Sequence, residues 1–285
     1  MPEATVALNY GFDTVATWIH GFDSPDKPSR ISRGLFGVDV GLPRILDLHD
    51  RLDVPGTFFT PGYTVESFPE ETGEIIDRGH EIQCHGWKHQ SALEFDSREA
   101  ERADIERALS AVEALAGERP TGYRSPTGDF SEWTFDILRE LGFEFDSSLL
   151  GRDFEPYFLR EDSFGTAPVD EPFERGEPTG MVEIPFKWLY TEFTYFTHIW
   201  SDPYRVGYGD EQAFFRRWRQ SFDWMYEHMD NGLFMPILHP QVSGQIPILQ
   251  AYEGFLEHAA SREDVAFKRM STVAEEFAAD PSSYG

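Results

Sequence analysis

Short apolar runs alternate with amphipathic stretches along almost the whole chain, and this alternation limits the possible folds more than any other feature. Eight runs have the length and residue content of buried strands. They are Thr5–Asn9, Gly56–Thr60, Glu81–Cys84, Gly122–Arg124, Phe143–Phe145, Met181–Ile184, Leu233–Leu238 and Val265–Lys268. Because strands that alternate with helices usually pair in parallel, we expect an α/β fold: a largely parallel sheet of seven or eight βα units, open or closed into a distorted (β/α) barrel.

The stretches between these runs carry apolar residues at helical spacing. In the clearest of them, Arg98–Ala116, apolar residues recur at steps of three and four. Glycines at positions 79, 117 and 142 each follow a predicted helix and precede a strand, as helix C-caps do. The other predicted helices are Gly41–Arg51, Glu70–Arg78, Glu132–Leu141, Glu211–Met229, Pro247–Ala260 and Thr272–Ala278.

The length and the spacing of the units indicate one domain over residues 1–285, because α/β barrels often reach this size as a single domain. One segment, Gly151–Gly180, is rich in Gly, Pro, Asp and Glu and has no clear periodicity. We expect it to be a long loop insertion over one end of the barrel, with a lid as one option. In a barrel of this kind the functional residues should follow the carboxyl ends of the strands.

The charge balance bears on partners and on environment. The chain has 51 acidic and 24 basic residues, a formal net charge of −27, and only four lysines. This excess makes nucleic acid an improbable partner. Acids scattered in this way favour a salt-rich, halophilic cytosol, because molar salt screens their mutual repulsion. An ordinary acidic protein is the alternative.

The cysteine count and the hydropathy pattern point to a cytoplasmic protein. Cys84 is the only cysteine, so no disulfide forms within the chain. The first ten residues lack a basic segment followed by a long apolar run, and no 18 consecutive residues are apolar. We therefore expect no signal peptide and no membrane partner.

Two histidines follow the predicted strand Glu81–Cys84 directly, in the run His85-Gly-Trp-Lys-His89. Two imidazoles four residues apart on one turn can bind a single cation. Asp13 follows the first strand and should lie at the same edge of the barrel. One carboxylate and two imidazoles leave coordination positions open, which is typical of a catalytic metal site for zinc, nickel, cobalt or iron. The alternatives are a surface or capping histidine pair and a helix-capping aspartate.

Two further residues stand at predicted strand ends. His239 follows Leu233–Leu238, where an imidazole could protonate a leaving amine. Arg124 ends another strand, and its guanidinium could orient a carboxylate or a substrate oxygen. A packed histidine and a plain salt bridge are the alternatives.

Together these motifs resemble the polysaccharide deacetylases. His85-Gly-Trp-Lys-His89 is similar to the metal motif of that family, Arg124-Ser125-Pro126 to its Arg-x-Pro motif, and Leu238-His239-Pro240 to its catalytic histidine motif. Asp146-Ser147-Ser148-Leu149 resembles the aspartate-containing fourth motif. The resemblance implies a hydrolase of a non-peptide C–N bond that uses a divalent metal, with zinc expected. It further implies that Asp13, His85 and His89 bind the metal while His239, Arg124 and Asp146 take part in catalysis.

The segments Ser32–Gly37 and Thr57–Gly62 resemble a cytosolic branch of this family, which includes a peptidoglycan deacetylase homologue and the allantoinases. This resemblance implies a homo-oligomer, with a tetramer expected. The substrate expected in this setting is a small molecule or an amino sugar. Within this reading, N-deacetylation competes with hydrolysis of a cyclic amide or imide.

One position departs from the family pattern. The family places a base aspartate before the ligand aspartate, and when Asp13 is aligned as the ligand, Gly11 occupies the base position. Loss of a general base costs about 10²–10⁴-fold in rate. Three outcomes remain open: the metal alone generates hydroxide, Asp129 serves as a displaced base, or the chain is an inactive homologue that binds a metal or a ligand.

Several aromatic residues lie within or beside these motifs and predict a pocket for a flat ring or a sugar face. Core packing is the alternative for each of them. They are Phe12, Trp18, Trp87, Tyr123 and Trp188.

Overall fold

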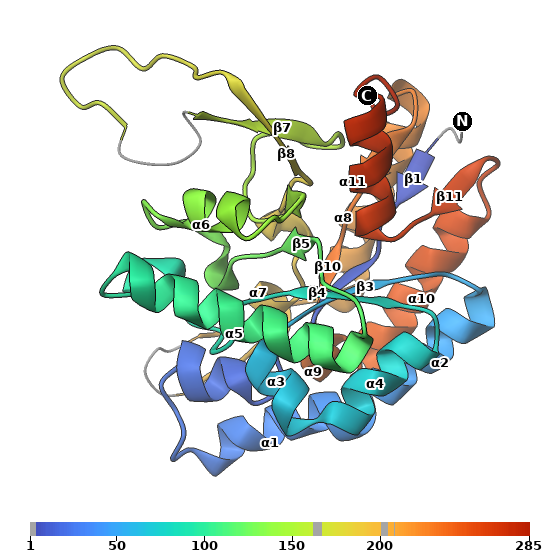
Figure 1. Cartoon of the computed structure of the whole chain (residues 1–285). Coiled ribbons are helices and arrows are strands. Elements are labelled where there is room, and N and C mark those ends of the chain that lie inside the picture. The colour runs from blue at the N-terminus through green and yellow to red at the C-terminus, as the bar shows by residue number, and fades with distance from the viewer. Residues whose placement is uncertain (1–3, 162–166, 201–204, 208) are drawn as a thin grey trace.

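The computed structural model describes residues 4–161, 167–200, 205–207 and 209–285. A curled sheet lies in the middle of the molecule, with helices around it (Figure 1). The main sheet has the strand order β10-β2-β3-β4-β5-β6-β8-β7, parallel throughout except for the antiparallel edge strand β7. A smaller parallel sheet has the order β11-β1-β9. The predicted α/β barrel-like fold is confirmed.

The strands correspond closely to the predicted apolar runs. Their bounds are β1 Ala4–Val6, β2 Asn9–Gly11, β3 Thr57–Thr60, β4 Glu81–Cys84, β5 Gly122–Tyr123, β6 Phe145–Asp146, β7 Tyr157–Arg160, β8 Pro178–Glu183, β9 Gly232–Phe234, β10 Ile237–Leu238 and β11 Val265–Phe267.

Two predicted strands are each divided in two. The run Thr5–Asn9 becomes β1 and the start of β2, and Leu233–Leu238 becomes β9 and β10. Pro236 interrupts the second run, because proline has no N–H to donate to a strand ladder. Beside this break, the side-chain Nδ2 of Asn9 donates to the carbonyl of Pro236 at 2.7 Å. A side chain thus bonds the backbone where the ladder is broken.

The main sheet curls until its two ends approach each other. Thr191, downstream of β8, forms an isolated parallel bridge with Ile237 of β10 at the opposite edge. This contact brings the segment after β8 next to the carboxyl end of β10. The residues that follow Thr191 therefore face the same end of the barrel as those that follow β2 and β4.

The helices follow the strands in the expected alternation. Gly117, at φ +74°, caps α5 as predicted. None of the helices that the structure describes combines the length and apolar character needed to cross a membrane. Their bounds are α1 Pro28–Phe36, α2 Leu42–Leu52, α3 Gly62–Ser67, α4 Pro69–Asp77, α5 Arg98–Ala116, α6 Thr134–Glu140, α7 Phe193–Phe196, α8 Glu211–His228, α9 Pro240–Ser243, α10 Ile246–Ala260 and α11 Met270–Ala279, with short turns η1 Thr17–Gly21, η2 Gly37–Gly41, η3 Ala92–Glu94, η4 Pro126–Gly128 and η6 Trp188–Tyr190.

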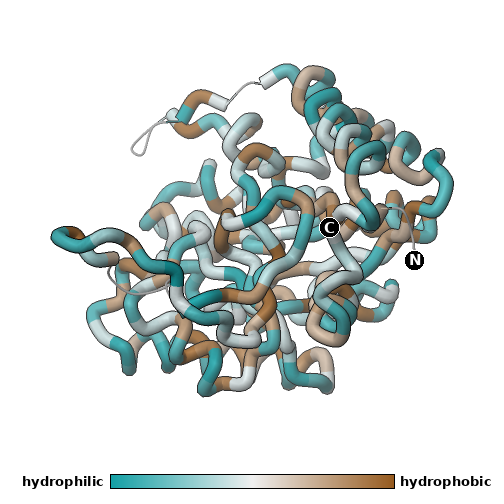
Figure 2. Tube along the Cα trace, turned by 90° about the horizontal axis from the view of Figure 1, so that it is seen from above, coloured by the Kyte–Doolittle hydropathy of each residue, from teal (hydrophilic) through white to brown (hydrophobic). Residues whose placement is uncertain are grey.

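The largest part of the core lies where α8 and α10 pack on the strands. Trp218 of α8 is fully buried, and its ring centroid lies 5.3 Å from that of Phe255 and 6.2 Å from that of Phe234. Burying one such side chain contributes about 1.5–3 kcal/mol. Hydrophilic and hydrophobic residues alternate along the outer helices (Figure 2), as expected for helices with one buried face. This packing fixes the strand ends that carry the site.

The described part of the insertion that follows β7, residues 167–177, does not lie over the catalytic end of the sheet. Its described part forms a hairpin, in which β7 runs antiparallel to β8. Because β8 is parallel to β6, residues 167–177, the loop just before Pro178, lie at the amino end of the strands. Figure 1 shows this loop at the end of the molecule where β1 begins. The expectation of a lid is therefore wrong for residues 167–177, which lie at the end of the sheet opposite the strand ends that carry Asp13, His85 and His239.

Candidate active site

Strands that lie close together in the sheet end at the residues predicted to be catalytic. Asp13 follows β2, His85 follows β4 and His239 follows β10. Since the carboxyl ends of parallel strands share one edge, these side chains converge. His89 lies in the turn after β4. The backbone of this turn is left-handed at Gly86, φ +65°, and at His89 itself, φ +55°. The structure thus brings together residues that are up to 226 positions apart.

Asp13, His85 and His89 form one compact group. Each offers a ligand atom, and these atoms lie within 4.8 Å of one another. The Nε2 of His85 is 3.6 Å from Oδ1 of Asp13, and the Nε2 of His89 is 3.5 Å from Oδ2. The Nδ1 of His85 bonds the carbonyl of Arg124 at 2.7 Å. That bond directs Nε2 toward Asp13, as expected of a metal-binding histidine.

The protonation states of this group suit a cation. Burial would raise the pKa of Asp13, but His89, His239 and His85 together hold it well below its usual range. Burial, reinforced by His89, lowers the pKa of His85 to about 3. The Oδ1 of Asp13 accepts no hydrogen bond from the described residues. A carboxylate with an unshared oxygen and two imidazoles fit a divalent metal ion.

A carboxylate–histidine pair stands beside this group. Glu192 accepts a hydrogen bond from the backbone N–H of His239 at 2.5 Å, and its other oxygen lies 2.9 Å from Nδ1 of the ring. The Nε2 of His239 faces Oδ2 of Asp13 at 3.8 Å. Burial lowers the pKa of His239, but Glu192 and Asp13 outweigh burial and raise it.

Sequence reasoning missed Glu192. No motif marks it, and its place depends on the bridge between Thr191 and Ile237. The only sequence signal is an isolated carboxylate within the aromatic-rich stretch 186–196.

Gly11 allows the close approach of His239. A Cβ added at this position would lie 2.9 Å from both Cδ2 and Nε2 of His239, and 3.0 Å from Oδ1 of Asp13. Contacts this short require one of the side chains to move. A side chain at the position where the family places its base would therefore press against the ring of His239.

Arg124 is buried behind this group and lines the cavity. Its Nη1 donates to Oδ1 of Asn9 at 2.6 Å, its Nε to the carbonyl of Ser147 at 2.7 Å, and its Nη2 to the Ser147 hydroxyl at 2.7 Å. Burial lowers its pKa to about 9. The partner of Arg124 on β2 is therefore an amide oxygen, not the carboxylate that a base aspartate would supply.

Asp146 and Asp129 do not reach the cavity. Asp146 is buried at the end of β6, where it accepts hydrogen bonds from the backbone N–H of Ser148 at 2.8 Å and from its hydroxyl at 2.9 Å. Asp129 is exposed, and its Oδ1 accepts from the N–H of Phe130 at 2.9 Å. The structure gives Asp146 the environment of a turn-stabilising residue and leaves the displaced-base role of Asp129 without geometric support.

A cavity of about 320 Å³ opens above the Asp-His-His group. Of the five aromatic residues predicted to contact substrate, Trp188 lines it. The other walls include Phe22, Phe186, Phe193 and Arg205, and no sequence motif indicates these four residues.

Four predicted substrate contacts lie elsewhere. Phe12 is buried in the main core, and Tyr123 packs against Phe143 at 5.6 Å between ring centroids. Trp87 lies under the guanidinium of Arg107, 3.3 Å from its ring centroid, and Trp18 borders a separate cavity. These rings lie close to the motifs in sequence, but none of the four lines the cavity above the Asp-His-His group.

A half-barrel of parallel strands with an Asp-His-His group and a carboxylate-paired histidine at one rim defines a hydrolase with a candidate metal centre. Residues 37–145 match the family model "Polysaccharide deacetylase". The chain is 33% identical over 283 residues to the peptidoglycan deacetylase of Helicobacter pylori. This alignment covers 96% of each of the two chains.

Solved structures agree with this likeness. A Mycobacterium smegmatis protein assigned to the polysaccharide deacetylases superposes with a TM-score of 0.83 and 28% identity over 98% of this chain and 92% of its own. The PuuE allantoinase superposes with a TM-score of 0.80 and 22% identity over 100% and 93%, and this shows a shared fold. The chain belongs to the polysaccharide deacetylase family, whose members hydrolyse amide C–N bonds.

Proposed function

We propose that this chain is a divalent-metal-dependent amide hydrolase that removes an acetyl group from a small amino sugar. One observation carries the proposal: the Nε2 atoms of His85, His89 and His239 lie 3.5–3.8 Å from the two carboxylate oxygens of buried Asp13. Asp13, His85 and His89 would hold the metal, with zinc the expected ion. A metal bound there supplies Lewis acidity toward a carbonyl oxygen and lowers the pKa of water.

His239 is suited to protonate the departing nitrogen. Glu192 bonds both its backbone N–H and its ring, so the imidazole is fixed in orientation with Nε2 toward the cavity. The raised pKa of His239 favours the protonated ring that a general acid requires. Arg124, which is held by Asn9 and Ser147, places a positive charge at the wall of the same cavity.

The cavity favours a substrate with one ring. Its volume of about 320 Å³ is at the lower end for small-molecule sites. Phe186, Trp188 and Phe193 provide apolar surface on which a sugar face can rest. The name of the Helicobacter pylori relative supports an N-acetylated amino sugar as the substrate class.

A cyclic amide or imide is the second candidate. Position 11 has no room for a base carboxylate while His239 keeps its present orientation. A ring carbonyl that is more electrophilic than an ordinary acetamide needs less help from a base. If acetamido sugars fail as substrates, ring opening becomes the favoured activity.

One preparation tests both candidates and the inactive alternative. Purified protein is loaded with zinc, nickel or cobalt and assayed against N-acetylglucosamine, N-acetylmuramic acid, hydantoin and succinimide, with His239→Ala as the matched control. We expect metal-dependent release of acetate from a sugar that the control lacks. Turnover of a cyclic imide alone would select the second candidate. Bound metal without turnover of any substrate would select the inactive homologue.

A further inference from the structure

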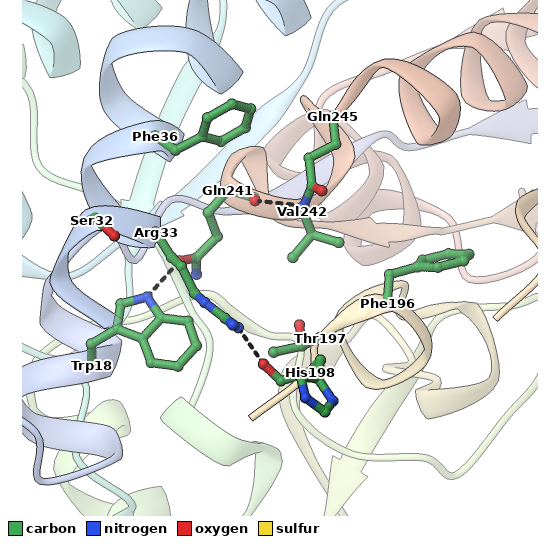
Figure 3. Close-up of a pocket in the computed structure, with 10 residues that line it drawn as sticks. All are labelled: Trp18, Ser32, Arg33, Phe36, Phe196, Thr197, His198, Gln241, Val242 and Gln245. Atoms are coloured by element: carbon green, nitrogen blue, oxygen red, sulfur yellow. Dashed lines mark hydrogen bonds between the residues drawn. The ribbon is translucent and has the colours of Figure 1, made fainter. Parts of the chain in front are cut away.

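A second cavity, of about 340 Å³, shares none of its described lining residues with the candidate active site. Figure 3 shows the residues that line this second cavity. Its walls come from η1, α1, α9 and the segment at the end of α7. Trp18, Phe36 and Phe196 give it aromatic surface. Its volume is sufficient for a small organic molecule.

Two buried polar groups on its wall lack partners among the described residues. Gln241 is 6% exposed, and its Oε1 accepts from Nε1 of Trp18 at 2.7 Å. That bond sets the orientation of the amide and leaves Nε2 without an acceptor in the described part of the chain. Thr197 is 4% exposed, and its hydroxyl likewise has no hydrogen-bond partner among the described residues. Because buried polar groups are normally hydrogen-bonded, two such groups on one cavity indicate a ligand with acceptor atoms.

The charge of the cavity favours an anion. None of the described residues that line it is acidic, although the chain carries a net charge of −27. Arg33 contributes a guanidinium, which donates from Nη1 to the carbonyl of His198 at 2.5 Å. Figure 3 shows the half-buried Arg33 side chain between Trp18 and Thr197, so its charge borders the cavity. Arginine and neutral donors together match the geometry of a carboxylate.

We propose that this cavity is a binding site for a small organic carboxylate, separate from the site of amide hydrolysis. The carboxylate accepts hydrogen bonds from Nε2 of Gln241 and the hydroxyl of Thr197 and lies beside the charge of Arg33. The apolar body of the ligand packs against Phe36 and Phe196. A neutral ligand of the same shape would forgo the attraction of Arg33.

Calorimetric titration at constant ionic strength tests this site, with benzoate as the probe and benzyl alcohol as its neutral counterpart. We expect saturable benzoate binding at least about tenfold tighter than that of the alcohol. Thr197→Val should weaken benzoate binding by about tenfold, because it removes one donor without changing the shape of the cavity. Gln241→Glu keeps the acceptor for Trp18 and replaces the free donor with a carboxylate oxygen, so it should abolish binding.

Two controls make the result specific. Thr194→Val changes an exposed threonine just upstream of Thr197 that does not line the cavity, and it should leave the affinity unchanged. His89→Ala removes a predicted metal ligand, and benzoate should still bind. Loss of binding in His89→Ala would place the anion at the metal site and overturn the proposal. Equal affinity for benzoate and benzyl alcohol, unchanged affinity in Thr197→Val, or no saturable binding would overturn it as well.

Discussion

His239 is held between two carboxylates at the wall of the candidate active site. Glu192 contacts its Nδ1 at 2.9 Å, and Asp13 lies 3.8 Å from its Nε2. At the scale of single residues, this arrangement does two things. It keeps a proton on the ring, through the raised pKa of His239, and it fixes the direction in which that proton points.

Glu192→Gln tests the role of this pair. The amide can still accept the backbone N–H of His239, but its NH₂ group would face Nδ1 and disfavour the Nδ1–H that the protonated ring must carry. We expect kcat to fall by about 10²-fold or more, with normal folding and metal content. If Glu192 acts only through His239, Glu192→Gln combined with His239→Ala should have the same kcat as His239→Ala alone. Additive losses of kcat would mean that Glu192 has an independent role.

Gly11→Ala tests the close contact between β2 and the His239 ring. The added methyl group would lie 2.9 Å from the ring, so we expect the ring to shift and kcat to fall by about tenfold or more, because small misplacements of catalytic groups are costly. Gly73→Ala is the matched control, since an added Cβ there has nothing within 4 Å and lies in α4. The control should keep full activity and gain about 0.5–1 kcal/mol of stability. Unchanged activity in Gly11→Ala would contradict the contact.

How far the sequence predicts this site depends on the kind of signal. Strand-end position and the four-residue spacing were enough to select Asp13, His85 and His89, which the structure brings into one group. Glu192 could not be selected, because its place depends on a single bridge between segments 46 residues apart in sequence. Phe12 and Tyr123 lie next to motifs in the sequence, but both side chains pack in the hydrophobic core.

At the scale of elements, a pair of buried acids joins the ends of β6 and β8. Asp146 and Glu183 are both fully buried, and Oε1 of Glu183 accepts from the backbone N–H groups of Ser148 and Leu149 at 3.0 Å and 2.8 Å. Burial raises the pKa of Asp146 to about 6. Burial and the charge of Asp146 raise the pKa of Glu183 well above its usual range. The folded pair therefore retains a proton that the unfolded chain releases.

This retained proton predicts a pH dependence of stability. A group whose pKa is raised in the folded state stabilises the fold fully below its unfolded pKa, about 4. That contribution is lost as pH rises through the folded pKa, which is about 6 for Asp146. For one proton the slope is about 1.4 kcal/mol per pH unit. Glu183→Gln keeps the acceptor oxygen and supplies a permanent donor, so the variant should gain stability over the wild type between pH 5 and pH 8.

Urea unfolding at pH 5, 6, 7 and 8 and fixed salt measures this difference. Glu257→Gln, at an exposed position of α10, is the control and should follow the wild type. Parallel stability curves for Glu183→Gln and the wild type would mean that the pair holds no extra proton.

The elements themselves were largely predictable, because strand and helix periods are local signals. The bounds of α5 and β4 agree with the predicted ranges. The division of two strands was not foreseen, although Pro236 marks one of the breaks. The hairpin of β7 and β8 was also missed, since Tyr157–Arg160 lies in a segment dominated by turn-forming residues.

At the scale of the whole molecule, the 51 acidic residues outnumber the 24 basic ones, so one basic side chain can contact several carboxylates. Arg78 alone contacts Asp47 at 2.8 Å, Asp50 at 2.5 Å and Glu74 at 3.1 Å. Exposed pairs of this kind contribute little each. The acids in excess of basic partners repel one another, and this repulsion extends over about 10 Å at 0.1 M salt and about 3 Å at 1 M.

Raising KCl from dilute buffer to 1 M should therefore raise the melting temperature steeply. Differential scanning calorimetry across this range checks the prediction, with sucrose at matched osmolality as the non-ionic control. Most of the gain should come below about 0.1 M, because the Debye length falls most there, from about 30 Å at 0.01 M to about 10 Å. An equal gain in sucrose, or a flat response to KCl, would remove halophily as the reason for the acidic surface.

A single domain and a homo-oligomer remain predictions.

The central claim is that Asp13, His85 and His89 hold one catalytic metal ion. Metal stoichiometry, measured by mass spectrometry after zinc loading and gel filtration, tests it most directly in the wild type, Asp13→Asn, His85→Ala and His89→Ala, with exposed His228→Ala as the control. We predict about one zinc per chain in the wild type and in His228→Ala, and almost none in the three site variants, all with wild-type circular dichroism. Stoichiometric zinc in the folded site variants, or none in the wild type with zinc, nickel or cobalt, would contradict the claim.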